Sequence, residues 1–253
     1  MANILDRYGI KEVADVTFYK IDPTTGNPAE PVLYLDTLKV STIEQTAENT
    51  SARGGKGNPE LIVWDYNKEI TVTLEDALFS AKSMAVMFGS GGKDVTVGSS
   101  MSTIYKTVRG KATADGTVTA ASTVAVTING KSAILSGLTY YDVNNGASVA
   151  TVTSGKEYII SGYLTNPSEG SVRVINIDAN TFPGTYYITG DTYARSEVDG
   201  TDEFFQFIIP KAKVNSEVTL TMEAEGDPST FSMTLKVLRP ANGEMMKLVQ
   251  YKI

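Results

Sequence analysis

Three segments of this sequence, residues 70–75, 217–223 and 231–237, alternate strictly between apolar and polar residues. Successive side chains of a strand point to opposite faces of its sheet, so each segment predicts a strand with one buried face. The polar positions are mostly short alcohols, where a solvated sheet usually carries long charged side chains: Thr71, Thr73, Thr219, Thr221, Ser232 and Thr234. The sequence therefore predicts a sheet with one apolar face and one smooth, wetted face.

Composition excludes several classes of function. The 253 residues are 42% apolar, enough for one large all-β domain or two small ones. Cysteine and histidine are both absent, which removes thiol nucleophiles, the usual general base and nearly every transition-metal site. We therefore expect neither an enzyme nor a bound cofactor or metal. A formal charge of −7 and a pI near 4.8 oppose tight nucleic-acid binding, which depends on Lys and Arg at phosphates.

No segment predicts export or membrane insertion. Residues 1–13 are polar and charged, and no later stretch approaches the roughly 20 apolar residues that a membrane-spanning helix needs. We expect a protein that is made in the cytoplasm and does not enter the membrane.

Most of the remaining chain also predicts strands. Alternation at 13–21 leads into a turn at 22–26, and strands are expected at 31–35, 38–47, 61–64, 186–195 and 203–211. In the 38–47 strand, Leu38 and Val40 should face the core, with Lys39 and Ser41 on the other side. The aromatic residues, including Trp64 and the pairs Tyr140-Tyr141 and Tyr186-Tyr187, are interpreted as packing residues.

The period changes from two to about 3.6 between residues 74 and 88. Leu74, Leu78, Ala81, Ala85 and Phe88 form an apolar stripe, which predicts one helix of three to four turns. Thr73 with Asp76 resembles a capping box, and Gly89 supplies a stop signal.

The middle of the chain differs in composition. Residues 110–182 are rich in Thr, Ala, Val, Gly and Ser, with hairpin-turn dipeptides at Asn129-Gly130 and Asn145-Gly146. We favour an inserted β subdomain at 110–182 within a discontinuous domain of residues 1–109 and 183–253. The alternative is a longer part of one sandwich.

Candidate active-site motifs are weak. Gly54-Gly55-Lys56-Gly57 and Gly91-Gly92-Lys93 lack the full spacing of a phosphate loop, and Asp142 to Gly146 lacks the later Glu of a calcium loop. All three are interpreted as turns. The acidic residues Glu223, Glu225 and Asp227 are interpreted as a charged face and not as a hydrolytic set.

Four stretches together resemble the tail tube protein, or major tail protein, of tailed bacteriophages: Val40 to Gly55, Ile70 to Ala77, Asp202 to Lys213 and Met222 to Phe231. The resemblance covers the N-terminal and C-terminal parts of the sequence, whereas the middle departs from a minimal member of the family. It implies a mainly β, sandwich or barrel-like domain with one flanking helix. Subunits of such proteins form rings, usually six-fold, that stack into a hollow tube lined by a continuous β-barrel.

Mapped onto this chain, the resemblance implies two surfaces. The lumen-facing set would be Lys39, Ser41, Thr71, Thr73, Thr219, Thr221, Glu223, Ser232, Thr234 and Lys236. Residues 47–58 would be a long loop that contacts the adjacent ring, through Ser51, Arg53, Gly54, Gly55, Lys56, Gly57 and Asn58. The positive charge of this loop could meet the acidic residues Glu225 and Asp227 of a neighbour.

The function implied is a structural virion protein whose tube conducts DNA during ejection into the host. Its partners would be further copies of itself, a tape measure protein, tail terminator and baseplate proteins and, in a contractile tail, a sheath protein. Double-stranded DNA would be a non-adhesive cargo, because hydroxyls hold water without presenting cations to phosphate. The alternative classes are a capsid or tail decoration protein, a secreted β-sandwich binding module and an enzyme. A contractile tail, a non-contractile tail and a tail-derived injection particle all fit the sequence equally, and the ring symmetry stays open.

Overall fold

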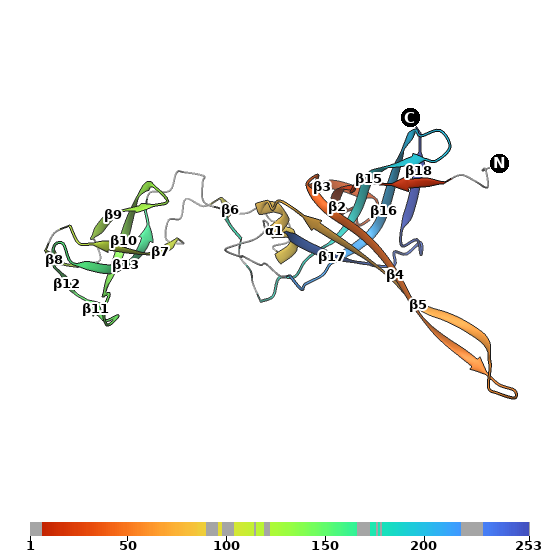
Figure 1. Cartoon of the computed structure of the whole chain (residues 1–253), viewed down its shortest axis with the longest axis horizontal. Coiled ribbons are helices and arrows are strands. Elements are labelled where there is room, and N and C mark those ends of the chain that lie inside the picture. Colours follow the sequence, from red (N-terminus) through yellow and green to blue (C-terminus); the bar gives the residue numbers. More distant parts are fainter. Residues whose placement is uncertain are drawn as a thin grey trace. The chain divides into compact units, whose positions relative to one another are not determined.

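The computed structural model in Figure 1 describes residues 7–89, 96–97, 104–113, 115–118, 122–165, 173–175, 177, 179–218 and 230–252. Strands dominate these residues, which contain a single helix, so the prediction of a mainly β fold is confirmed. The chain divides into two compact units, residues 1–95 with 175–253 and residues 96–174. Each unit has its own hydrophobic core.

The first unit is built on one antiparallel sheet, with nine strands in the described part of the chain. Seven strands lie in the order β3-β2-β15-β16-β17-β5-β4, while β1 pairs with β15 and β18 pairs with β16. Their bounds are β1 (Tyr8–Ile10), β2 (Asp15–Ile21), β3 (Pro28–Leu35), β4 (Leu38–Arg53), β5 (Glu60–Asp76), β15 (Thr185–Ser196), β16 (Asp202–Val214), β17 (Phe231–Val237) and β18 (Lys247–Tyr251).

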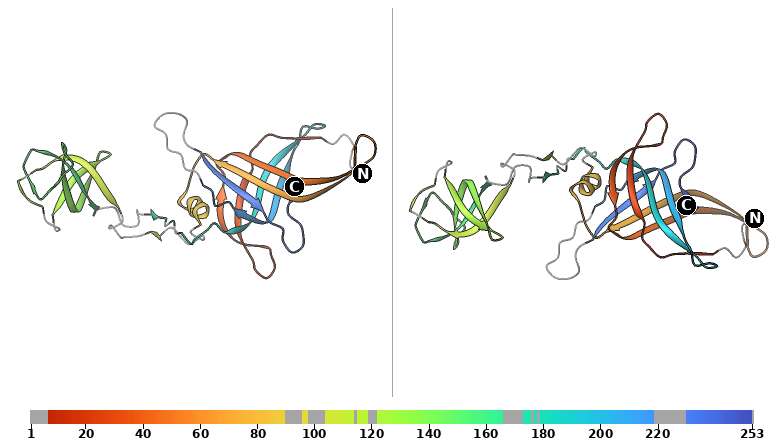
Figure 2. Two further views of the ribbon diagram at one scale, coloured as in Figure 1. Left: turned by 90° about the horizontal axis from the view of Figure 1, so that it is seen from below. Right: turned by 90° about the horizontal axis from the view of Figure 1, so that it is seen from above.

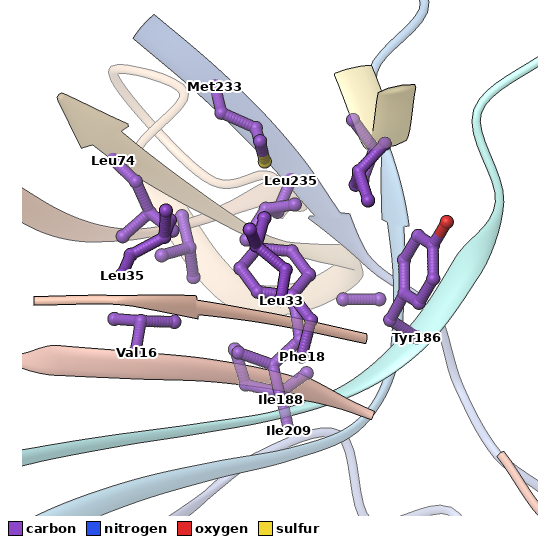
Figure 3. Packing of buried hydrophobic residues seen from close by; sticks show 14 of the residues in the cluster. Val16, Phe18, Leu33, Leu35, Leu74, Tyr186, Ile188, Ile209, Met233 and Leu235 are labelled. Carbon is purple, nitrogen blue, oxygen red and sulfur yellow. The ribbon is translucent and has the colours of Figure 1, made fainter. Parts of the chain in front are cut away.

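The sheet curves so that its two halves share one core (Figure 2). Figure 3 shows side chains of β2, β3, β5, β15, β16 and β17 converging there, among them Phe18, Ile188 and Leu235, which are fully buried. Burying a side chain of this size stabilises the fold by roughly 1.5–3 kcal/mol. The predicted apolar positions Ile70, Val72, Leu74, Met233 and Leu235 all belong to this core, so the alternation at 70–74 and 231–237 is confirmed.

The alternation predicted for β4 is only half right. Leu38 is buried as expected, but Val40 is 40% exposed and lies opposite Glu75. The pairing register shifts between Leu38 and Val40, so Lys39 is an extra residue in a β-bulge. One extra residue reverses which face each later side chain meets, and this is why Val40 does not face the core.

The helix α1 (Ala81–Phe88) is shorter than predicted. Leu74 and Asp76 belong to β5, where they pair with Met233 and Phe231, so the proposed Thr73–Asp76 cap is wrong. The helix begins after Ser80, whose Oγ accepts from the backbone N–H of Ser83 at 3.0 Å. The Ser83 Oγ accepts in turn from the backbone N–H of Ser80 at 2.8 Å, which completes a capping box.

The end of the helix is confirmed. Gly89 caps α1 in the left-handed region, with φ at 83° and its N–H bonded to the carbonyl of Ala85. Glycine adopts this conformation without the steric penalty that a Cβ brings.

The second unit is a smaller β structure. Its main sheet contains β7 (Tyr105–Lys111), β9 (Thr123–Ile128), β10 (Lys131–Asp142), β11 (Ser148–Val149) and β13 (Glu157–Leu164). Two short pairs join β8 (Gly116–Thr117) to β12 (Thr151–Val152) and β6 (Thr96–Val97) to β14 (Arg173–Val174). The core of this unit includes Leu135, Tyr140 and Ile160.

The turn chemistry of the second unit follows its sequence. Asn129 and Gly130 join β9 to β10 with φ of 49° and 77°, as a two-residue hairpin with both central residues at positive φ requires. The predicted turn at residues 142–146 is also present, closed by the N–H of Gly146 on the carbonyl of Asp142 at 2.8 Å.

The limits of this unit differ from the sequence estimate of 110–182. Strand β7 begins at Tyr105, before the expected start, and residues 175–182 group with the first unit. The composition shift misses β7 because Tyr105–Lys111 is richer in charge than the strands that follow it.

Candidate functional site

Four of the predicted hydroxyl residues lie side by side on the outer face of β5 and β17: Thr71, Thr73, Ser232 and Thr234. Thr73 is directly opposite Thr234, Thr71 is opposite Lys236, and Glu75 is opposite Ser232. Directly paired residues of an antiparallel sheet share a face, here the face opposite the core residues Val72 and Leu235. The register therefore gathers alcohols from two distant parts of the chain into one surface.

Strand β4 extends this surface with residues that the sequence reading missed. Thr42 lies opposite Thr73 and Glu44 opposite Thr71. The missed signal is the bulge at Lys39, which shifts the polar set on β4 from odd to even positions after residue 39. We call this surface the polar wall and define it by Thr42, Glu44, Thr71, Thr73, Glu75, Ser232, Thr234 and Lys236.

Acidic residues outnumber basic residues on the polar wall. The Nζ of Lys236 lies 2.7 Å from Oε1 of Glu69, so this cation already has a carboxylate partner. Glu44 and Glu75 add negative charge beside the threonines. An anionic polymer would find hydroxyls and carboxylates here and one lysine that is already paired.

The other predicted wall residues have different positions. Ser41 lies opposite Leu74, on the core side of β4, and its Oγ accepts from the backbone N–H of Ala14 at 3.4 Å. Lys39 is exposed in the bulge. Thr219, Thr221 and Glu223 lie outside the described residues, as do Glu225, Asp227 and Gly91-Gly92-Lys93.

A second feature is the long hairpin formed by β4 and β5, which projects beyond the rest of the sheet (Figure 1). We call residues 48–66 the arm. Residues 47–58 were expected to form a loop, and this is wrong for most of them, because β4 continues through Arg53 and the connection is only residues 54–59. No residue between 48 and 69 is buried.

The tip of the arm is a tight turn that carries one lysine, Lys56. Gly55 and Gly57 both have φ of 85°, and Asn58 has φ of 49°, so the turn depends on residues that tolerate the left-handed region. Arg53, which was expected to offer its charge to a neighbour, bonds Glu60 within the arm at 3.0 Å. Lys56 is the exposed lysine of the turn itself.

The arm carries large apolar side chains on its surface. Ile62, Trp64 and Tyr66 are 52%, 51% and 46% exposed, and their alternate spacing places them on one face. The interpretation of Trp64 as a packing residue is therefore wrong within this chain, whereas Tyr140 and Tyr186 are buried as expected. An exposed row of this kind marks an interaction surface.

One buried carboxylate ties strands β1 and β18 to the sheet. Glu203 on β16 accepts from Nζ of Lys252 at 2.6 Å, from Nε2 of Gln250 at 2.7 Å and from the hydroxyl of Tyr8 at 3.3 Å. The Lys252 ammonium, bonded to the carboxylate, lowers the pKa of Glu203. Strands β1 and β18 are thereby held at the same end of the sheet.

The described residues contain no cluster of three or more Asp and Glu side chains placed to hold a metal ion. Nor do they include a helix of the length and apolar character needed to cross a bilayer.

Comparison with known proteins agrees with the geometry. The model of one protein family, described as the YomU/Tube protein family, matches residues 8–250 of this chain. Among curated proteins, no sequence matches it.

Proposed function

The chain belongs to the YomU/Tube protein family of phage tail tube proteins, and from this premise we propose that its copies form stacked rings, six subunits each, that conduct DNA during ejection. As a tail tube protein it is a structural component of the virion. Assembly in the cytoplasm of the host and a non-enzymatic role are parts of the proposal.

The observation that carries the proposal is the polar wall. Hydroxyls of Thr71, Thr73 and Thr234 share one solvent-facing surface, while the apolar residues between them pack into the core. In a ring this surface would line the channel. Threonine hydroxyls hold water but give phosphate no cationic partner, so DNA would slide along the wall and not bind to it.

Charge supports the same role. Each copy contributes a formal charge of −7, and the lysine of the wall is already paired with Glu69. A ring multiplies this negative charge around the channel, where repulsion of phosphate acts over a Debye length of about 8 Å at physiological salt.

Ring closure also solves a problem of the isolated subunit. Strands β3 and β4 end the sheet path, so each leaves one edge without a partner strand in the described part of the chain. Long open edges invite uncontrolled pairing, and closure of neighbouring sheets into a barrel removes them. We propose that these two edges join neighbouring subunits within a ring.

The arm would reach the adjacent ring. Its length, its exposed surface and Lys56 at its tip suit a contact outside the subunit's own sheet. Because Arg53 is paired within the arm, Lys56 is the cleaner position at which to reverse charge, and Lys56→Glu should weaken tube formation if the tip meets an acidic surface.

Other tail components would bind the ends and the outside of the tube. A tape measure protein would occupy the channel during assembly, terminator and baseplate proteins would cap the ends, and a sheath protein would surround the tube in a contractile tail. Family membership supports association with tail components in general.

Electron microscopy of the purified protein tests assembly directly. We expect rings or hollow tubes, and a persistent monomer at all concentrations would contradict the proposal.

The wall is tested by Thr73→Lys, with Thr127→Lys on β9 of the second unit as a control that adds the same charge elsewhere. Both residues are solvent-facing in the subunit, so both variants should form tubes. Only Thr73→Lys tubes should retain short duplex DNA in sedimentation at low salt, and equal retention by the two would count against the channel assignment.

A further inference from the structure

The arm has a counterpart surface at the other end of the same strand. Strand β5 begins in the arm at Glu60 and ends at Asp76, and α1 follows a few residues later, so the arm and α1 lie toward opposite ends of β5 (Figure 1). Leu78 and Phe79, between β5 and α1, are 64% and 57% exposed. Phe79 contacts Phe231, with ring centroids 4.5 Å apart. We call Leu78, Phe79 and Phe231 the apolar platform.

The platform is held in place by polar contacts on both sides. The carboxylate of Asp76 accepts from the backbone N–H of Leu78 at 3.1 Å and from the hydroxyl of Thr37. One residue after Phe79, Ser80 forms the cap of α1 with Ser83. The platform is therefore a fixed surface, although Leu78 and Phe79 are mostly exposed to solvent.

A shallow apolar recess lies beside the platform. Its lining includes Leu78 and Phe231, together with Leu35, Leu38, Met87 and Met233. A large side chain that covered Leu78 and Phe79 would also close this recess. The platform thus offers both a flat aromatic contact and an adjoining depression.

The arm presents a row that matches this surface in its apolar character. Ile62, Trp64 and Tyr66 lie opposite Ala52, Thr50 and Glu48 on β4, so small or polar neighbours leave the three large side chains free to meet a partner. The row on the arm and the platform both expose apolar side chains to solvent in the isolated subunit, and both occur once in every copy.

We propose that the Ile62–Trp64–Tyr66 row of one copy docks on the apolar platform of a copy in the next ring. This inference rests on the proposed function and identifies the receiving surface for the arm. Two different patches on one molecule make a head-to-tail contact, and such a contact extends an assembly along an axis when its rotation does not close into a ring. Burial of Trp64 and Phe79 supplies the apolar contact that the arm's tip turn, rich in glycine, does not.

The chain has no cysteine of its own, so cysteines can be introduced at single positions. Cross-linking between them tests the pairing. Trp64→Cys and Phe79→Cys are prepared as separate chains, mixed, assembled and treated with a short bis-maleimide, and linked peptides are identified by mass spectrometry. Leu248→Cys on β18, an equally exposed apolar position, replaces Phe79→Cys in the control mixture. We expect links between residues 64 and 79 in the tube fraction, and few between 64 and 248.

Labelling of the same thiols identifies other occupants. Cys at position 79 should react with a maleimide in the monomer and be protected in the tube. Protection already in the monomer would mean that the platform is covered by its own chain, and links only between two copies of residue 64 would mean that arms pair with each other. Either result overturns the proposal.

Charge at the platform gives an independent measure. Phe79→Asp should raise the subunit concentration needed for assembly by about tenfold or more, since 1.4 kcal/mol corresponds to a factor of ten. Leu248→Asp should have little effect. Tubes that form without links between 64 and 79, and without sensitivity to Phe79→Asp, would reject this contact while leaving the tube function intact; absence of tubes from the unmodified protein would reject the function itself.

Discussion

At the scale of single residues, the core of the first unit depends on a glycine beneath an aromatic ring. Gly190 on β15 pairs directly with Phe207 on β16, and Phe207 is 3% exposed. A Cβ added at Gly190 would overlap the ring of Phe207. The buried ring can move only by displacing other core side chains, so the hydrogen atom at this position is a packing requirement.

Gly190→Ala should lower the free energy of unfolding by about 1–3 kcal/mol, the usual cost of overpacking a core. Gly9→Ala is the matched control, because Gly9 also lies in a strand and an added Cβ there meets nothing within 4 Å. Urea unfolding followed by circular dichroism measures both. Equal stability of the two variants would contradict the packing argument.

The turn between β15 and β16 contains a carboxyl whose acidity is strongly increased. Hydrogen bonds from Ser196 and from the hydroxyl and N–H of Thr201 lower the pKa of Asp199 to about 2, from an ordinary value of 3.8. The folded state therefore favours the ionised form. Its contribution to stability is complete above the unfolded pKa and is lost as pH falls through the folded pKa.

The stability difference between the wild-type protein and Asp199→Asn should accordingly shrink as the pH falls from about 4 to about 2. Thermal unfolding of both proteins across this range measures the difference, and an NMR titration of the Asp199 carboxyl carbon gives the pKa directly. A titration midpoint at the ordinary value would show that the turn does not hold the carboxylate.

At the scale of secondary-structure elements, the strands were predictable where the pairing is regular. Residues 70–74 and 231–237 alternate in sequence and in burial, because each pairs with its neighbour without a shift. The face of β4 was not predictable beyond Leu38, because the bulge at Lys39 is specified by the three-dimensional register and leaves no mark on composition. Ser41 was assigned to the polar wall for this reason, and Thr42 was missed.

The helix shows a different limit. Leu74 fits the helical stripe by spacing, yet it stays in β5 because pairing with both β4 and β17 satisfies its backbone. Residues 47–58 were expected to form a loop by resemblance to tail tube proteins, but β4 continues through Arg53 and the glycines occupy only the tip of the arm. Tertiary pairing overrode local pattern in both places.

The capping box of α1 gives a prediction at this scale. Ser80→Ala removes the acceptor for the N–H of Ser83 and should destabilise the helix by about 1 kcal/mol, which accelerates hydrogen exchange of α1 amides about fivefold. Ser80→Asp retains an acceptor and should exchange at close to the wild-type rate. Unchanged exchange in Ser80→Ala would show that packing alone fixes the start of the helix.

At the scale of the whole molecule, the two units are separable in their packing. The nine strands of the large sheet come from residues outside 96–174, and the described core of the first unit contains no residue from that range. The second unit has a core of its own around Leu135 and Ile160. We therefore propose that the polar wall, the arm and the apolar platform function without the second unit.

Replacement of residues 96–174 by a short Gly/Ser linker should leave a folded protein that still forms tubes. Circular dichroism checks folding, and electron microscopy checks assembly. A folded variant that stays monomeric would assign the second unit a part in assembly, whereas an insoluble variant would show that the first unit needs it to fold.

The shared bonds of Tyr8 and Gln250 to Glu203 have a practical consequence for engineering. Strand β1 pairs with the end of β15 and strand β18 with the start of β16, so Tyr8 and Gln250 lie at the same end of the sheet. A label attached at Tyr8 and one attached at Gln250 would thus lie close together. Genetic joining of the ends, with new termini opened in an exposed turn, would leave the order of the strands unaltered.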